Sequence, residues 1–152
     1  MATLALLFAS CASPSAAKVR ISGLTDVNFG LISNLMADAV QSQSLCIYSN
    51  GPTGRYGIRA DGSGSAGAFT LSNGVSSLTY DVRWNSQSGQ TNGATLTPGT
   101  MLGGQVSNAQ NQQCSSGPPT SASLIVTLPA ASLSAATEGS YAGTLTIIVA
   151  EE

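Results

Sequence analysis

The segment from Ala68 to Trp84 restricts the fold more than any other part of the sequence. Its two arms are separated by Asn73-Gly74, a dipeptide that favours the positive φ values of a tight hairpin turn. Successive side chains of a strand point to opposite faces. The pattern therefore predicts a β-hairpin whose second arm has one face in the core. In that arm the apolar residues Leu78, Tyr80, Val82 and Trp84 alternate with Thr79, Asp81 and Arg83.

The rest of the sequence repeats this kind of signal. Short apolar or alternating runs lie between clusters of Gly, Asn, Ser and Pro, which predicts strands separated by turns. The segment from Ala130 to Thr137 is either one helical turn or a loop that crosses between sheets. No second domain is indicated, so we expect one all-β domain, an antiparallel sandwich or barrel. The remaining predicted strands are Val19–Leu24, Val27–Ile32, Leu45–Tyr48, Arg55–Ala60, Ala94–Leu96, Met101–Val106, Leu124–Leu128 and Tyr141–Val149.

Residues 1–17 resemble a signal peptide in composition. An apolar run from Leu4 to Ala9 is followed by small residues up to Ala17, and cleavage there would leave Lys18 first. The segment lacks a basic start and its apolar run is short, which a start site placed too far downstream would explain. The alternatives are a frayed N-terminal tail and a lipidated Cys11. With cleavage, the folded domain covers residues 18–152.

The cysteines predict a disulfide. Cleavage would remove Cys11 and leave Cys46 and Cys114, and an even pair in an exported chain favours a bond between them. The closed loop would hold about 70 residues, for which the chain-entropy model gives roughly 4 kcal/mol of stabilisation. A redox-active pair is the alternative, which the wide separation of the two cysteines and the exported context disfavour.

The composition argues against several classes of function. The chain has no His, only 8% charged residues and a net charge of −2. Without His a catalytic Ser-His-Asp or Cys-His arrangement cannot be built, and two cysteines alone are poor zinc ligands. There is no basic stripe to attract nucleic acid, and no apolar stretch long enough to make a membrane span in the mature chain. We therefore expect no enzyme activity, no cofactor and no metal.

Two local features allow a functional and a structural interpretation. The loop Asp61-Gly62-Ser63-Gly64 lacks the repeated carboxylates of a calcium site and the Lys of a phosphate loop, which favours a flexible turn. Tyr80 and Trp84 could form a platform on which a sugar stacks. Their alternation with Asp81 and Arg83 favours core positions instead.

Four motifs in this order resemble the spore coat protein U domain family, over a region from about Val19 to the C-terminus. The resemblance implies a subunit of archaic chaperone–usher pili, which are adhesive fibres of Gram-negative bacteria. It implies an immunoglobulin-like sandwich that lacks its last strand. A periplasmic chaperone fills the gap first, a neighbouring pilus subunit fills it later, and an outer-membrane usher directs export to the cell surface. The motifs are Leu24–Gly30, Leu45–Ser49, Leu78–Trp84 and Gly139–Thr146.

The last predicted strand gives this implied mechanism a basis in the sequence itself. A seven-strand sandwich needs a further strand beside Tyr141–Val149, and an open apolar groove there would invite a strand from another chain. We expect this acceptor groove to be lined by Tyr141, Leu145, Ile147 and Val149. The alternative is a complete sandwich in which these are ordinary core residues. It would make the protein a free-standing secreted carbohydrate-binding or envelope protein.

The start of the mature chain bears on the place of such a subunit in a fibre. Val19–Leu24 continues into the Thr25–Gly30 motif without a linker, so we expect it to be the domain's own first strand. A subunit that accepts a strand and has none to donate ends a fibre, which predicts a tip or terminal subunit. The alternative is a shaft subunit that donates Val19–Leu24.

Overall fold

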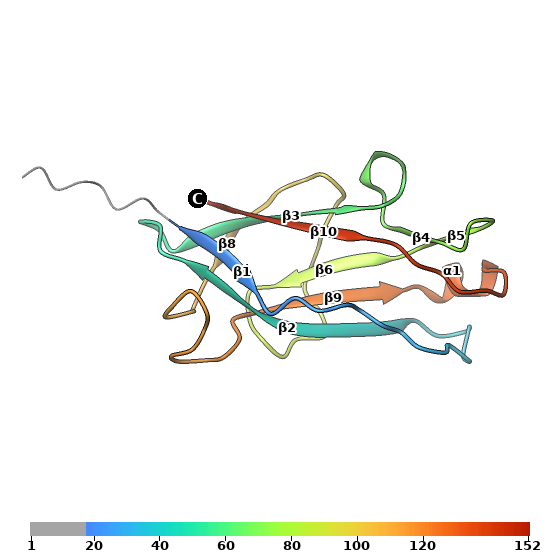
Figure 1. Cartoon of the computed structure of the whole chain (residues 1–152), viewed down its shortest axis with the longest axis horizontal. Coiled ribbons are helices and arrows are strands. Elements are labelled where there is room, and N and C mark those ends of the chain that lie inside the picture. The colour runs from blue at the N-terminus through green and yellow to red at the C-terminus, as the bar shows by residue number, and fades with distance from the viewer. Residues whose placement is uncertain (1–17) are drawn as a thin grey trace, which may run out of the picture.

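The computed structural model describes residues 18–152 as two antiparallel sheets that share one core, with a small hairpin at one end (Figure 1). This confirms the predicted all-β sandwich. The predicted signal peptide, residues 1–17, lies outside the described residues. Among the described residues, no helix is both long enough and apolar enough to span a membrane.

The larger sheet has five strands and the smaller sheet has three. The larger contains, in spatial order, β1 (Val19–Ser22), β2 (Ala39–Ser49), β9 (Ala122–Leu128), β6 (Asp81–Asn85) and β7 (Ala94–Thr95). The smaller contains β10 (Leu145–Glu151), β3 (Arg55–Gly62) and β8 (Leu102–Val106). The hairpin is β4 (Thr70–Ser72) and β5 (Ser77–Thr79), and the helical elements are η1 (Ser65–Gly67) and α1 (Ala130–Ala135).

The strand order corresponds to that of an immunoglobulin-type sandwich. Strands β1, β2, β9 and β6 take the places of strands A, B, E and D, and β3 and β10 take those of C and F. In that fold a seventh strand, G, pairs with strand F. Here β10 is the edge strand of its sheet, and among residues 18–152 no strand occupies the position of G.

The core contains side chains from both sheets. Trp84 is 1% exposed, and its indole N–H donates a hydrogen bond of 3.1 Å to the Tyr56 hydroxyl across the sandwich. The two rings meet edge to face, with centroids 6.4 Å apart. Burial raises the pKa of Tyr56 to about 12, partly offset by this hydrogen bond. Trp84 and Tyr80, which is 5% exposed, are therefore core residues, as their alternation with Asp81 and Arg83 predicts.

Most of the predicted strands are present, with four main differences. Strand β2 begins at Ala39 rather than at the predicted Leu45. The hairpin around Asn73-Gly74 is confirmed, and the Tyr80 N–H continues its pairing by donating to the Phe69 carbonyl. Its second arm is nevertheless divided after Thr79, because from Asp81 onward the chain pairs with β9 instead. The chain then enters the larger sheet at β6. The strand predicted at Val27–Ile32 is wrong, because that segment has no regular secondary structure. The last strand starts at Leu145 rather than at Tyr141.

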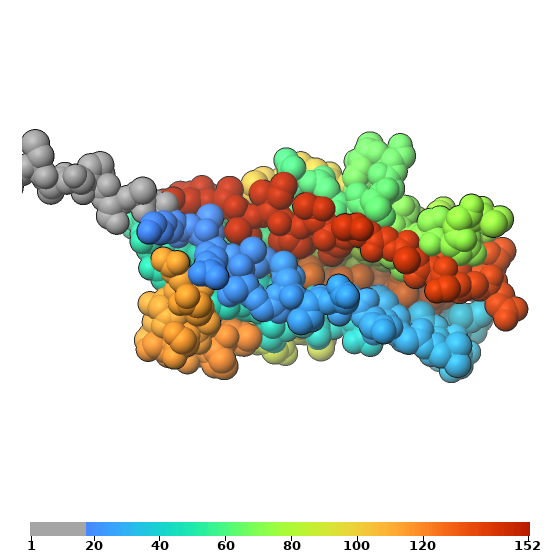
Figure 2. Space-filling view, in the orientation of Figure 1, coloured from blue at the N-terminus to red at the C-terminus, as the bar shows by residue number. Residues whose placement is uncertain are grey.

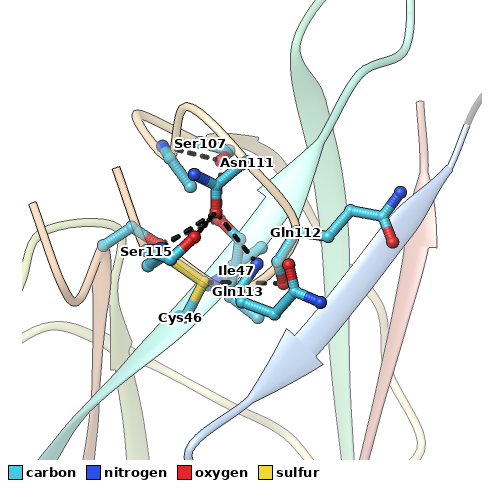
Figure 3. Close-up of a disulfide and its surroundings, with 10 residues drawn as sticks. Cys46, Ile47, Ser107, Asn111, Gln112, Gln113 and Ser115 are labelled. Atoms are coloured by element: carbon cyan, nitrogen blue, oxygen red, sulfur yellow. Dashed lines mark hydrogen bonds between the residues drawn. A yellow bond between two sulfur atoms is a disulfide. The ribbon is translucent and has the colours of Figure 1, made fainter. Parts of the chain in front are cut away.

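The predicted disulfide between Cys46 and Cys114 is confirmed, with Cα atoms 5.9 Å apart (Figure 3). It attaches the loop before β9 to the outer face of β2. The loop is organised by Asn111, whose side-chain oxygen accepts hydrogen bonds from the N–H groups of Gln113 and Ser115. Ser107 adds a further contact, since its hydroxyl donates to the Ile47 carbonyl at 2.7 Å.

Candidate functional site

A groove of about 1050 Å³ runs between two segments that are far apart in the sequence. One wall is formed by Leu24–Ile32 and Leu35. They belong to the connection from β1 to β2, and its residues Leu24–Met36 are named here the strap. The other wall is formed by the chain from Ala136 to Ile147, including the first half of β10. Figure 2 shows the blue strap and the red C-terminal strand as separate ridges, with the orange atoms of β9 visible between them.

The floor of the groove is apolar. Its members come from the hairpin and the residue that follows it, and from the consecutive elements β9 and α1 much later in the sequence. Tyr80 is the only residue among them with a polar group; its ring stacks on Phe69 at 5.6 Å, and burial raises the pKa of its hydroxyl. The floor therefore suits aliphatic side chains. Its residues are Leu71, Leu78, Tyr80, Leu124, Val126, Leu128 and Leu133.

Strand β10 presents a free backbone edge to this side of the molecule. The Glu152 N–H donates to the Arg55 carbonyl at 3.3 Å, and residues along an antiparallel ladder alternate between bonding to the partner and pointing away. With the observed register, Thr146 and Ile148 bond to β3. The N–H and C=O groups of Leu145 and Ile147 point the other way, where β10 has no paired strand within residues 18–152.

The same edge continues ahead of β10. Ala142 exchanges two backbone hydrogen bonds with Ser72, at 2.8 and 3.0 Å, so by alternation the backbone groups of Tyr141 and Gly143 face the groove. Tyr141 is held in place by its hydroxyl, which donates to the Thr137 carbonyl at 2.9 Å. The free edge thus extends over more residues than the regular strand does.

Three of the four predicted groove residues lie in the groove. Tyr141, Leu145 and Ile147 line it, whereas Val149 does not. Val149 packs against the core in the half of β10 that runs toward the C-terminus, and β1 lies beside β10. The role of the other three residues as acceptors of a strand stays a prediction. All three are half-buried rather than fully buried.

The strap is the part of the site that the sequence reasoning missed. Its residues Val27, Phe29 and Ile32 are half-buried and pack against the core. The spacing of Val27 and Phe29 is the available signal, and it predicts a strand over Val27–Ile32. The structure places these residues in a wall that has no regular pairing. Leu31, 96% exposed, and Met36, 84% exposed, point away from the core.

The groove offers shape and backbone groups rather than reactive side chains. The charged residues that line it are Asp26 and Glu138, both exposed. In the part of the chain that the structure describes, the one ion pair is Arg59 with Asp61, away from the groove lining. That part also contains no cluster of three metal-ligating side chains. What the arrangement can bind is an extended apolar segment that needs backbone partners.

No protein-family model and no curated protein matches the sequence. Among solved structures, one similar chain comes from a chaperone–tip adhesin complex described as vital for synergistic activation of CFA/I fimbriae biogenesis. Its sequence identity is 18% and its TM-score is 0.54. The match covers 90% of this chain but only 41% of the other, longer chain. This likeness agrees with the sandwich fold. Another similar chain comes from the CsuC–CsuE chaperone–tip adhesion subunit pre-assembly complex of archaic chaperone-usher Csu pili of Acinetobacter baumannii. It has 22% identity and a TM-score of 0.46 over 88% of this chain and 39% of that chain.

Proposed function

We propose that this protein is a structural or adhesive subunit of a secreted surface pilus, and that its groove accepts a β-strand from another chain. The observation that carries the proposal is the combination of an apolar floor with a free backbone edge along one wall. Tyr141, Leu145 and Ile147 supply that edge, and the vacant position beside β10 is the one that strand G fills in a complete sandwich.

The energetics favour occupation of this groove. An edge strand with unpaired N–H and C=O groups beside apolar side chains is a template for a strand from another chain. Such a strand would cover the floor, and removing apolar surface from water contributes about 25 cal/mol per Å². Main-chain hydrogen bonds would add affinity, and alternate side chains in the groove would add specificity.

The identity of the partners follows from the pilus proposal and is part of it. The strand would come first from a periplasmic chaperone and then from a neighbouring subunit, with an outer-membrane usher directing export to the cell surface. The matched structure of a chaperone–tip adhesin complex supports a chaperone partner. Under this proposal the protein works by assembly and adhesion and is not an enzyme.

A terminal position in the fibre is the finer proposal. Strand β1 is part of the domain's own larger sheet, in register with β2 from Val19 opposite Ser49 to Ser22 opposite Cys46. This pairing supports the expectation that Val19–Leu24 serves its own domain and is not donated to a neighbour.

The test uses a synthetic strand. We would titrate the protein with a nine-residue peptide in which valines alternate with threonines, with a lysine at each end, and measure the melting temperature. The proposal predicts a rise in Tm that grows with peptide concentration, because ligand binding to the folded state stabilises it. A scrambled peptide of the same composition is the control. Equal Tm values with and without the alternating peptide would contradict the proposal.

A further inference from the structure

The strap lies beside β2 without pairing to it. Strand β2 is paired with β9 over Ala39–Leu45, and with β1 only from Cys46 onward. Its other edge over Ala39–Ser44 therefore faces the strap with no backbone ladder between them. A small pocket of about 230 Å³ separates the two, lined by Thr25–Asn28 on the strap and Gln41–Gln43 on β2.

A single side chain bridges this gap. The Gln43 side-chain oxygen accepts hydrogen bonds from the N–H and the hydroxyl of Thr25, at 2.9 and 3.1 Å. The Gln43 amide nitrogen donates to the Thr25 carbonyl at 3.0 Å. The Gln43 side chain thus bonds both the N–H and the C=O of Thr25. In an antiparallel sheet these two groups would instead bond to one residue of a neighbouring strand. The Gln43 side chain therefore takes the place of a backbone partner for Thr25, and its length keeps the strap apart from the β2 backbone.

The rest of the strap has few backbone partners. Within the described residues its other hydrogen bonds are local, from the Gly30 N–H to Asn28 and from the Met36 N–H to Asn34. Backbone N–H and C=O groups that leave water need partners. Two unpaired edges, the strap and the first half of β2, therefore lie next to one another with room to approach.

We propose that Gln43 is a positioning residue that prevents the strap from pairing with β2 and keeps its backbone groups available to the groove. This rests on the proposed function. An entering strand then pairs on both sides, with β10 on one edge and the strap on the other. The partner must consequently be an extended segment whose two backbone edges are both free along the groove. Gln43 fits this position because it lines both the groove and the small pocket.

The comparison of two leucine variants tests the role of Gln43. Gln41 lies on the same face of β2, lines the same small pocket and makes no side-chain hydrogen bond within residues 18–152, so Gln41→Leu is the matched control. With the alternating valine–threonine peptide, Gln43→Leu is expected to bind about tenfold more weakly than the wild type. Gln41→Leu is expected to bind as the wild type does.

Residue-resolved amide exchange separates this inference from the proposed function. In the wild type and in Gln41→Leu, bound peptide should slow exchange at Leu145 and Ile147 and also along the strap from Asp26 to Phe29. In Gln43→Leu the protection at Leu145 and Ile147 should remain and that on the strap should be lost. Thr25→Pro, which removes both Thr25 donors and leaves β2 unchanged, should behave like Gln43→Leu.

Two results would overturn the inference. The first is peptide protection on β10 without protection of the strap in the wild type. The second is a Gln43→Leu variant with wild-type affinity and strap protection. Absence of protection on β10 in the wild type would instead refute the proposed function, and the inference with it.

Discussion

The two halves of β2 differ sharply in how they are held. The half from Cys46 to Ser49 pairs with β1, is cross-linked through Cys46 and Cys114, and bonds through Ile47 to the buried Ser121 hydroxyl. The half from Ala39 to Ser44 pairs on one side with β9, and on the other side only the Gln43 side chain reaches the strap.

The two halves of β2 therefore contribute to different properties, one to the stability of the domain and the other to the proposed binding of a strand. The cross-linked half closes the sandwich at the end where β1 meets β10. The other half lies along the groove, where the apolar floor is covered on one side by a strap with almost no ladder of its own. We infer that the disulfide-bonded half of β2 stabilises the fold, and that the other half forms part of the groove that binds a strand from a partner.

The largest expected effect follows from removing the disulfide. Its two cysteines are 68 residues apart, for which the chain-entropy model gives a stabilisation of about 4 kcal/mol. We expect the double variant Cys46→Ala with Cys114→Ala to lose about that much free energy of unfolding in a urea titration. An unchanged urea midpoint would mean that this half of β2 is held by other contacts.

The next largest effect concerns binding in the groove, and it compares two neighbouring residues of β10. Ile147 lines the groove, whereas Ile148 is 38% exposed on the other face of the strand. A charge facing an apolar groove is costly to bury. We therefore expect Ile147→Asp to weaken binding of the valine–threonine peptide by about 100-fold, roughly 2.7 kcal/mol.

Ile148→Asp is the matched control and should leave peptide affinity within about twofold of the wild type. The near-ultraviolet circular dichroism of Trp84 reports whether each variant keeps its core. If both variants keep that signal and bind equally well, the peptide does not lie against this face of β10.

The smallest expected effect concerns Ser121, which contacts the disulfide-bonded half of β2. The Ser121 hydroxyl accepts from the Ile47 N–H at 2.8 Å and donates to its carbonyl at 2.9 Å, at a site that is 1% exposed. Ser121→Ala leaves the Ile47 N–H without this partner, while the Ile47 carbonyl keeps its bond from the Ser107 hydroxyl. An unsatisfied buried donor costs about 1–3 kcal/mol. Unfolding in urea should show this loss, with unchanged affinity for the peptide. A variant as stable as the wild type would contradict the role given to Ser121.

Much of the sandwich could be predicted from local patterns. Asn73-Gly74 and the alternation from Leu78 to Trp84 identified the hairpin and its inward face, because turn chemistry and side-chain periodicity are local properties. The division of that arm at Tyr80 could not be predicted, since it depends on the change of partner from the hairpin to β9, which lies far along the chain.

The candidate site was predictable on one side only. Tyr141, Leu145 and Ile147 belong to one run of sequence, and the resemblance to pilus subunits that lack their last strand indicated a free edge beside it. The strap has a strand-like pattern at Val27 and Phe29, but pairing depends on what lies beside it, here the Gln43 side chain. The exclusion of Val149 likewise depends on β1, which lies far away in the sequence.

The central claim is that a strand from another chain pairs with the free edge of β10. The most direct measurement is residue-resolved amide exchange with and without the valine–threonine peptide, compared between successive residues of that strand. We predict that the peptide slows exchange at Leu145 and Ile147, and leaves Thr146 and Ile148 unchanged because these already bond to β3. Equal slowing at all four residues, or none at Leu145 and Ile147 with the peptide in saturating excess, would contradict the account.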